Sequence, residues 1–132
     1  MQIRTFTGGG FGQNAYLTVC ESSQAAAAID PGADAPRMAD VLRSEKLDLQ
    51  AILLTHSHID HIEGVDAIRR VAPDVPIWLH PDALGMYRAL PQQAAAFGLR
   101  AAPQPEPTHE LAHGQRLDIG GCTLDVRSAP GH

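Results

Sequence analysis

Residues 54–64 read LTHSHIDHIEG. It places His56, His58, Asp60 and His61 directly after the apolar run AILL. Imidazole nitrogens and carboxylate oxygens are the ligands that zinc, iron and manganese use in catalytic sites, where one position stays open for water. His56 and His58 are two residues apart, so they project to the same side of an extended segment, and Asp60 and His61 follow where the chain bends. The pattern predicts a metal site.

The cluster offers more ligands than one ion can use, because so short a segment cannot bring all four side chains to a single tetrahedron. Two ions about 4 Å apart solve the problem, since together they bridge a water and clamp the attacking and leaving groups. The alternative is a solvent-exposed histidine-rich loop. With 7 histidines in 132 residues, this pattern arises by chance in roughly one chain in 10³, so a metal site is favoured. His80, His109 and His113 are expected to be structural or surface histidines.

The composition is that of a globular protein, and it excludes several classes of function. The 132 residues are 44% hydrophobic and 19% charged, which predicts one domain over residues 1–132. The net charge of -5 comes without basic clusters, so no nucleic-acid partner is expected. No apolar run approaches the roughly 18 residues of a membrane span, and the N-terminus does not resemble a signal peptide. We therefore expect a cytoplasmic protein with no membrane partner.

The order of apolar patterns predicts an α/β fold. An antiparallel β start is followed by an amphipathic helix behind Asp34 as its N-cap, then by a doubly buried strand that ends at the histidine cluster, a second helix and another strand. Residues 91–108, rich in Ala, Gln and Pro, are expected to form a surface loop or a poorly packed helix. A hairpin turning at IGG is expected near the end. The elements are expected at residues 2–6, 14–19, 25–30, 35–45, 49–55, 63–71 and 75–80.

The two cysteines are Cys20 and Cys122. They lie far apart in the sequence, in strand-like segments and without C-x-x-C spacing. Two buried thiols are expected rather than a disulfide or a redox pair.

Five short segments occur in the order found in one known family. They are NAYL, IDPGAD, LLTHSHIDHIEG, LHPDAL and SAPGH. On these segments the sequence resembles the metallo-β-lactamase-fold hydrolases, in the branch of glyoxalase II, or hydroxyacylglutathione hydrolase. The resemblance implies an αββα sandwich with metals at the edge of its two sheets.

The resemblance also implies a role for each matching residue. His56, His58 and His132 would bind a first metal, and Asp60 and His61 a second. Asp60 would also orient a metal-bound hydroxide and handle its proton as the hydroxide attacks a thioester carbonyl. The implied cofactor is Zn²⁺, one or two ions per chain, with iron or manganese as an option at one site. The implied partner is a small-molecule substrate, a thioester.

The resemblance covers the whole chain but only the N-terminal two-thirds of the family's catalytic domain. The family pattern continues beyond P-G-H with a bridging aspartate and a later histidine, and Asp118 and Asp125 cannot replace them because they precede His132. We therefore expect a C-terminally truncated domain, an incomplete αββα sandwich with an apolar sheet face left open for a homo-oligomer, and a second metal site that is weak or empty. The α-carboxylate of His132 is a hypothetical substitute ligand.

Two alternatives stay open beside thioester hydrolysis. One is an iron-dependent persulfide dioxygenase, which resembles the same motif set but uses a single iron. The other is a non-catalytic metal-binding half-domain, in which the ions only hold the loop. A lactonase or β-lactamase would use the same scaffold, and in this family substrate identity depends on loops that follow the P-G-H element.

Overall fold

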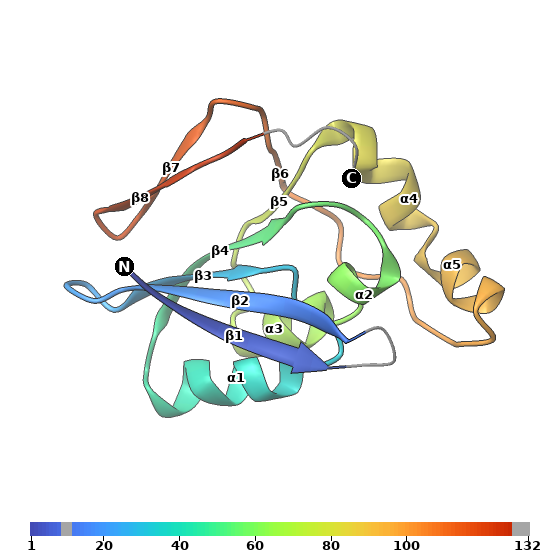
Figure 1. Ribbon diagram of the computed structural model, residues 1–132, viewed down its shortest axis with the longest axis horizontal. Coiled ribbons are helices and arrows are strands. Elements are labelled where there is room, and N and C mark those ends of the chain that lie inside the picture. Colours follow the sequence, from blue (N-terminus) through green and yellow to red (C-terminus); the bar gives the residue numbers. More distant parts are fainter. Residues whose placement is uncertain (9–11, 128–132) are drawn as a thin grey trace.

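The computed structural model describes residues 1–8 and 12–127 and contains a six-stranded sheet with helices packed on one face (Figure 1). The strand order is β1-β2-β3-β4-β5-β6. The first three strands are antiparallel neighbours, and the remaining pairs are parallel. The strands are β1 Gln2–Gly8, β2 Gln13–Cys20, β3 Ala25–Ile29, β4 Asp48–Leu54, β5 Ile77–Leu79 and β6 His109–Glu110.

The helices follow the parallel part of the sheet because parallel neighbours need crossover connections. Among the described residues they are α1 Ala35–Ser44, α2 Ile59–Ile62, α3 Val65–Val71, η1 Pro81–Ala83, α4 Leu84–Arg88 and α5 Leu90–Ala96. α1 and α3 lie side by side under the sheet (Figure 1). Met38, Ile52 and Ile68 are fully buried in the core between these helices and the sheet. This layer confirms the predicted α/β class.

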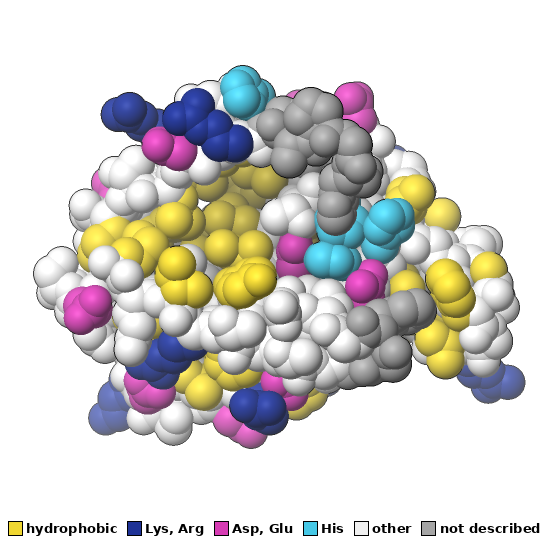
Figure 2. Space-filling view, in the orientation of Figure 1, with side chains coloured by type: hydrophobic (Ala, Val, Ile, Leu, Met, Phe, Trp, Pro, Cys, Tyr) yellow, Lys and Arg dark blue, Asp and Glu magenta, His cyan; other side chains and the backbone are white. Residues whose placement is uncertain are grey.

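The opposite face of the sheet is covered in part by a hairpin of β7 Arg116–Ile119 and β8 Cys122–Asp125. Figure 1 shows the hairpin on the side of the sheet away from α1. Leu117 and Ile119 pack with Ala27 and Leu53 in a second core cluster. Figure 2 shows a hollow lined by hydrophobic side chains on this face. The incomplete second layer matches the expected incomplete αββα sandwich, and a homo-oligomer through this face stays a prediction.

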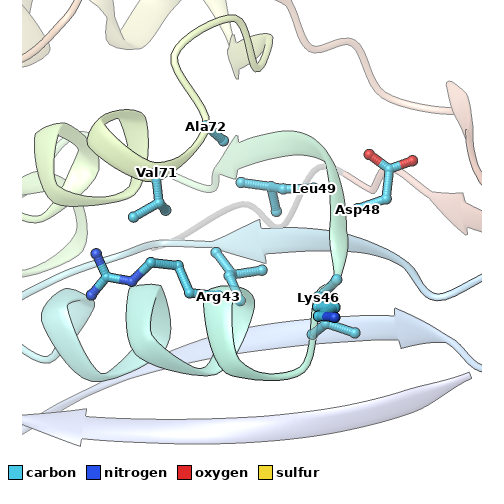
Figure 3. Close-up of a pocket in the computed structure, with 8 residues that line it drawn as sticks. Arg43, Lys46, Asp48, Leu49, Val71 and Ala72 are labelled. Carbon is cyan, nitrogen blue, oxygen red and sulfur yellow. The ribbon is translucent and has the colours of Figure 1, made fainter.

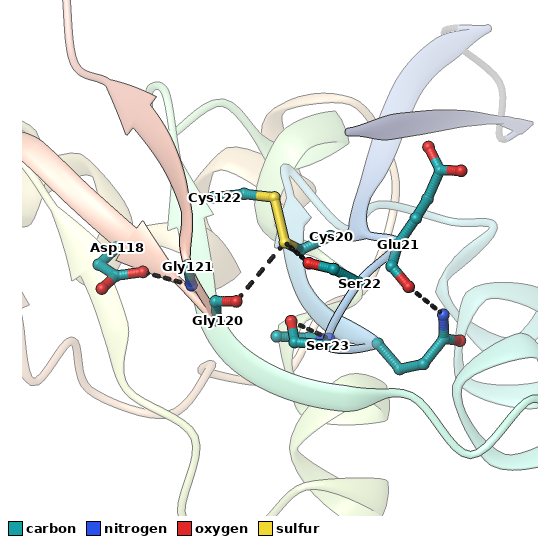
Figure 4. The surroundings of a disulfide bond; sticks show 10 residues. Cys20, Glu21, Ser22, Ser23, Asp118, Gly120, Gly121 and Cys122 are labelled. Atoms are coloured by element: carbon teal, nitrogen blue, oxygen red, sulfur yellow. Dashed lines mark hydrogen bonds between the residues drawn. A yellow bond between two sulfur atoms is a disulfide. The ribbon is translucent and has the colours of Figure 1, made fainter.

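A disulfide joins the hairpin to β2, and the expectation of two buried thiols is wrong (Figure 4). Cys20 and Cys122 are separated by 102 residues, yet their Cα atoms lie 5.7 Å apart, within the range that a disulfide spans. The hairpin reaches this position because Gly120 has no side chain. A Cβ atom on Gly120 would lie 2.3 Å from the Cβ of Ala25, and its φ of +62° is one that glycine adopts readily.

Two local expectations can be compared with the structure. Residues 91–108, expected to form a surface loop or a poorly packed helix, divide into two parts: the end of helix α5, in which Ala94 is the buried residue among 91–96, and a largely exposed stretch without helix from residue 97 on. Asp34 precedes α1 as expected but makes no side-chain cap hydrogen bond, and its carboxylate pairs with Arg37 instead. No helix in the described ranges is long and apolar enough to cross a membrane.

Candidate metal centre

The site forms where β3 and β4 end side by side. Ile29 is paired with Leu53 in the parallel register. Asp30 and Thr55 therefore emerge at the same edge of the sheet, because parallel neighbours have their carboxyl ends together. The chain then runs extended through His58, which has φ -70° and ψ 145°, before α2 begins. Figure 2 shows histidine side chains gathered beside acidic ones on this surface.

Asp30 is the hub of the site. Its carboxylate is buried, and it accepts three hydrogen bonds: Oδ1 from the Thr55 backbone N–H at 2.7 Å, and Oδ2 from the Thr55 hydroxyl at 2.6 Å and from His61 Nδ1 at 2.9 Å. A direct ligand role is the alternative, since one ligand atom each from Asp30, His56 and His61 lies within 4.8 Å of the others. The three accepted bonds favour an orienting role, in which a carboxylate holds the ligand histidines.

The Asp30 contacts set the tautomers of two histidines. A carboxylate only accepts, so Nδ1 of His61 carries the proton and Nε2 is left to bind a metal. The Thr55 hydroxyl gives its one proton to Asp30, so at 3.0 Å it accepts from Nδ1 of His56. His56 is thereby also left with Nε2 as its ligand atom. The donor set of imidazole nitrogen and carboxylate oxygen fits a divalent metal ion.

Asp60 and His61 lie together, as their assignment to one metal requires. His61 Nε2 is 3.5 Å from Oδ2 of Asp60, and both side chains are about one-fifth exposed, at 20% and 23%. Partial burial by itself lowers the pKa of His61, but the hydrogen bond to Asp30 and the charges of Asp30 and Asp60 outweigh it and raise that pKa. Burial and the charge of Asp60 raise the pKa of neighbouring Glu63. The ring of His61 therefore sits in a negative field suited to a cation.

The three histidine rings are close neighbours. The ring centroids of His56 and His58 are 4.7 Å apart, and those of His56 and His61 are 3.8 Å apart. The four predicted ligands in this segment are therefore neighbours, and among them His56 and His61 have ligand atoms within 4.8 Å of each other and of Asp30. The fifth, His132, lies outside the described residues, and so does the hypothesis about its α-carboxylate.

Two glycines let the loop after β3 pack backbone to backbone on the histidine segment. A Cβ atom on Gly32 would lie 2.3 Å from the carbonyl oxygen of Asp60, and one on Gly64 would lie 2.1 Å from the carbonyl oxygen of Gly32. The Gly64 N–H donates to the Pro31 carbonyl at 2.9 Å. The segments DPG and HIEG therefore form one unit, and Asp30 is held at the histidines by this contact.

Sequence reasoning missed the roles of Asp30, Thr55 and Gln13. Buried Gln13 donates from Nε2 to the Asp30 carbonyl at 3.1 Å, and Nε2 lies 3.5 Å from His61 Nδ1. Asp30 has a φ of +51°, a left-handed conformation that aspartate tolerates better than most residues. The available signal was an aspartate directly after one strand and a threonine directly after the next. Two parallel strand ends of this kind place such residues at one edge.

Among the described residues, His80, His109 and a cavity at the start of β4 do not join the site. His80 accepts from the Asp82 N–H at 3.1 Å, and the ring of His109 stacks on Trp78 with centroids 4.5 Å apart. A cavity of about 330 Å³ lies between the end of α1, the start of β4 and the end of α3 (Figure 3). Arg43 and Lys46 line it, and none of its lining residues belongs to the histidine cluster.

Comparisons with known proteins show the family and the fold. A family model described as the beta-lactamase superfamily domain matches residues 27–132. The crystal structure of the BLEG-1 B3 metallo-β-lactamase is similar with a TM-score of 0.83 and 32% identity, over 98% of this chain and 62% of that one. The chain belongs to the metallo-β-lactamase superfamily.

Two further relatives of this superfamily member bear on its chemistry. The crystal structure of TTHA1623 in a di-iron-bound form is similar with a TM-score of 0.75 and 34% identity, over 86% of this chain and 56% of that one. A hydroxyacylglutathione hydrolase of Vibrio campbellii is 31% identical over 122 residues, which are 92% of this chain and 40% of that protein. The chain thus spans about half the length of the relatives it matches.

Proposed function

We propose that this chain carries the metal-binding part of a hydrolase that cleaves small-molecule thioesters, as a hydroxyacylglutathione hydrolase does. The observation that supports this most is a set of hydrogen bonds around Asp30. Asp30 accepts from His61 and from the Thr55 hydroxyl, and that hydroxyl accepts from His56, so the ring proton of both histidines is on Nδ1 and Nε2 is the ligand atom. Similarity to the Vibrio campbellii hydrolase supports the substrate class.

In this proposal His56, His58 and His132 hold a first metal ion, and Asp60 and His61 hold a second. The bound ions supply Lewis acidity, which makes water more acidic and stabilises negative charge on a carbonyl oxygen. Asp60 orients the attacking water and takes up its proton, since its partly exposed carboxylate lies beside His61. The thiolate product needs no strong acid to leave, because an ordinary thiol already has a pKa of about 8.5.

Zinc is the proposed metal, with one or two ions per chain, and iron or manganese is an alternative at one site. The di-iron structure of TTHA1623 supports two adjacent metals in a relative. We propose that the first site is the stronger in this chain, because the proposed second set has only Asp60 and His61.

The test is metal content by element on the 132-residue chain, purified without chelators, followed by hydrolysis of S-lactoylglutathione. Replacing His58 by alanine should abolish metal retention and any thioester cleavage. His80→Ala is the matched control, because the half-exposed ring of His80 contacts Asp82 outside the cluster. Unchanged metal content in His58→Ala would refute the site, and metal without thioester cleavage would refute the substrate class for this chain.

The second candidate is a non-catalytic metal-binding half-domain. The chain spans 40% of the Vibrio campbellii hydrolase and 56% of the TTHA1623 chain. One metal equivalent or less together with no thioester cleavage would support this candidate. A single iron with oxygen consumption on a glutathione persulfide would instead support the persulfide dioxygenase.

A further inference from the structure

The side-chain amide of Gln93, on α5, makes three hydrogen bonds to backbone groups of other segments. Its Nε2 donates to the carbonyl oxygens of Ser57 and Met86, each at 2.8 Å. Its Oε1 accepts from the Ile59 backbone N–H at 3.1 Å. A terminal amide has two donor hydrogens and one acceptor oxygen, so all of its hydrogens are used. Such a side chain is fixed in position and can fix its partners.

The two partners in the histidine segment are the peptide groups on either side of His58. The Ser57 carbonyl belongs to the peptide that precedes His58, and the Ile59 N–H belongs to the peptide that follows it. Holding both peptide planes fixes the φ and ψ of the residue between them. For His58 these are -70° and 145°, an extended conformation directly before α2. The direction of its Cα–Cβ bond is thereby set.

The Ile59 N–H would otherwise lack a partner from its own helix. The first N–H groups of a helix have no intrahelical acceptor. His58, at the N-cap position of α2, provides no side-chain cap hydrogen bond. Gln93 supplies the acceptor from another element, 34 residues further along the chain.

A second contact braces the same segment from the same side. The side chain of Ser57 is buried, with 1% exposure, and its hydroxyl donates to the Ala83 carbonyl at 2.8 Å. The segment from η1 to α5, residues 81–96, therefore holds the chain at Ser57 and at Ile59. The backbone of α5 is in turn anchored by Leu90 and Ala94 in the core.

We propose that Gln93 is a positioning residue for the metal centre and acts through His58. The inference rests on the proposed metal site. Without the Gln93 amide, the peptide groups on either side of His58 lose their fixed orientation. The imidazole must then be ordered when the metal binds, which weakens binding. The expected cost is about 10- to 100-fold in metal affinity, the range typical for partners that orient metal ligands.

The test compares Gln93→Met with Gln92→Met in the 132-residue chain. Methionine keeps the length and volume of glutamine but makes none of the three bonds. Gln92 is the matched control, because it lies next to Gln93 on α5 and is exposed. Zn²⁺ affinity is measured by competition with a chromophoric chelator, the absorption spectrum of the Co²⁺ form reports ligand geometry, and urea unfolding of the metal-free chain reports folding.

We expect weaker Zn²⁺ binding and an altered Co²⁺ spectrum in Gln93→Met, and neither change in Gln92→Met. A Gln93→Met chain that binds Zn²⁺ like the parent, with the same Co²⁺ spectrum, overturns the inference and leaves the proposed function standing. A parent chain that binds no Zn²⁺ overturns the proposed function and the inference with it. If Gln93→Met does not fold, Gln93→Glu replaces it, since glutamate keeps the acceptor for Ile59 and loses both donors; parent-like Zn²⁺ binding in that variant overturns the inference.

Discussion

Replacing Gly64 by alanine should destabilise the chain. The added Cβ would lie 2.1 Å from the Gly32 carbonyl oxygen, 2.4 Å from the Cβ of Ala35 and 3.0 Å from the Pro31 carbonyl oxygen. None of these atoms belongs to a flexible side chain that could rotate away. The loop after β3 must therefore move as a whole.

The cost follows from two effects. Overpacking of this kind costs about 1–3 kcal/mol, and the upper end applies because backbone is displaced. The hydrogen bond from the Gly64 N–H to the Pro31 carbonyl, now 2.9 Å long, would also be lost, at a net cost of about 1 kcal/mol. The sum is about 3–4 kcal/mol, which lowers the urea midpoint by roughly 2 M for a small domain.

The assay is urea unfolding of the metal-free chain, followed by circular dichroism. Gly85→Ala is the matched control, because a Cβ atom there meets nothing within 4 Å and alanine is preferred inside helix α4. We expect Gly85→Ala to leave the midpoint unchanged or raise it. A Gly64→Ala midpoint equal to that of the parent would refute the close contact between the DPG and HIEG segments.

Three further predictions concern the hub and the disulfide. Asp30→Asn should weaken Zn²⁺ binding about 10- to 100-fold by releasing the His61 ring, measured by chelator competition; equal affinity would show that Asp30 does not orient it. The pKa of His61 is raised in the folded, metal-free chain. The contribution of His61 to stability should therefore be complete below the unfolded pKa of about 6.5 and should fade as the pH rises through the folded pKa. An NMR titration of His61 checks the direction of the pKa shift, and Asp30→Asn should reverse that direction. Replacing Cys122 by serine removes the disulfide that closes a 102-residue loop, and the free energy of unfolding should fall by about 4–5 kcal/mol. If adding reductant leaves the urea midpoint of the parent chain unchanged, the stabilising role of the disulfide is refuted.

The disulfide also bears on location. A cytoplasmic location stays a prediction, and structural disulfides persist mainly in oxidising compartments. Alkylating the thiols in intact cells before lysis separates the two cases. Free Cys20 and Cys122 thiols would accord with the cytoplasm, and a protected pair would contradict it.

Local patterns predicted most of the elements. The apolar run before the cluster, predicted to be a strand buried on both faces, forms β4. Val65 and Ile68, whose spacing predicted a helix, are the buried residues of α3. These predictions succeed because apolar periodicity reflects burial directly. For residues 91–96 the pattern left a loop and a helix open, because the docking of α5 through Leu90 and Ala94 depends on contacts with other elements, such as α2 and α4. Those contacts are not encoded in the segment itself.

The ligand types and their crowding can be predicted from the sequence, because His56, His58, Asp60 and His61 lie within one short segment that no fold can separate. The contacts that hold these ligands in place come from distant parts of the chain. Asp30 contacts His61 although it lies 31 residues earlier in the sequence, and Gln93 contacts Ile59 although it lies 34 residues later. Cys20 is bonded to Cys122 across 102 residues. These contacts depend on strand register and helix docking, which are set by the whole core and not by the spacing of the residues that meet.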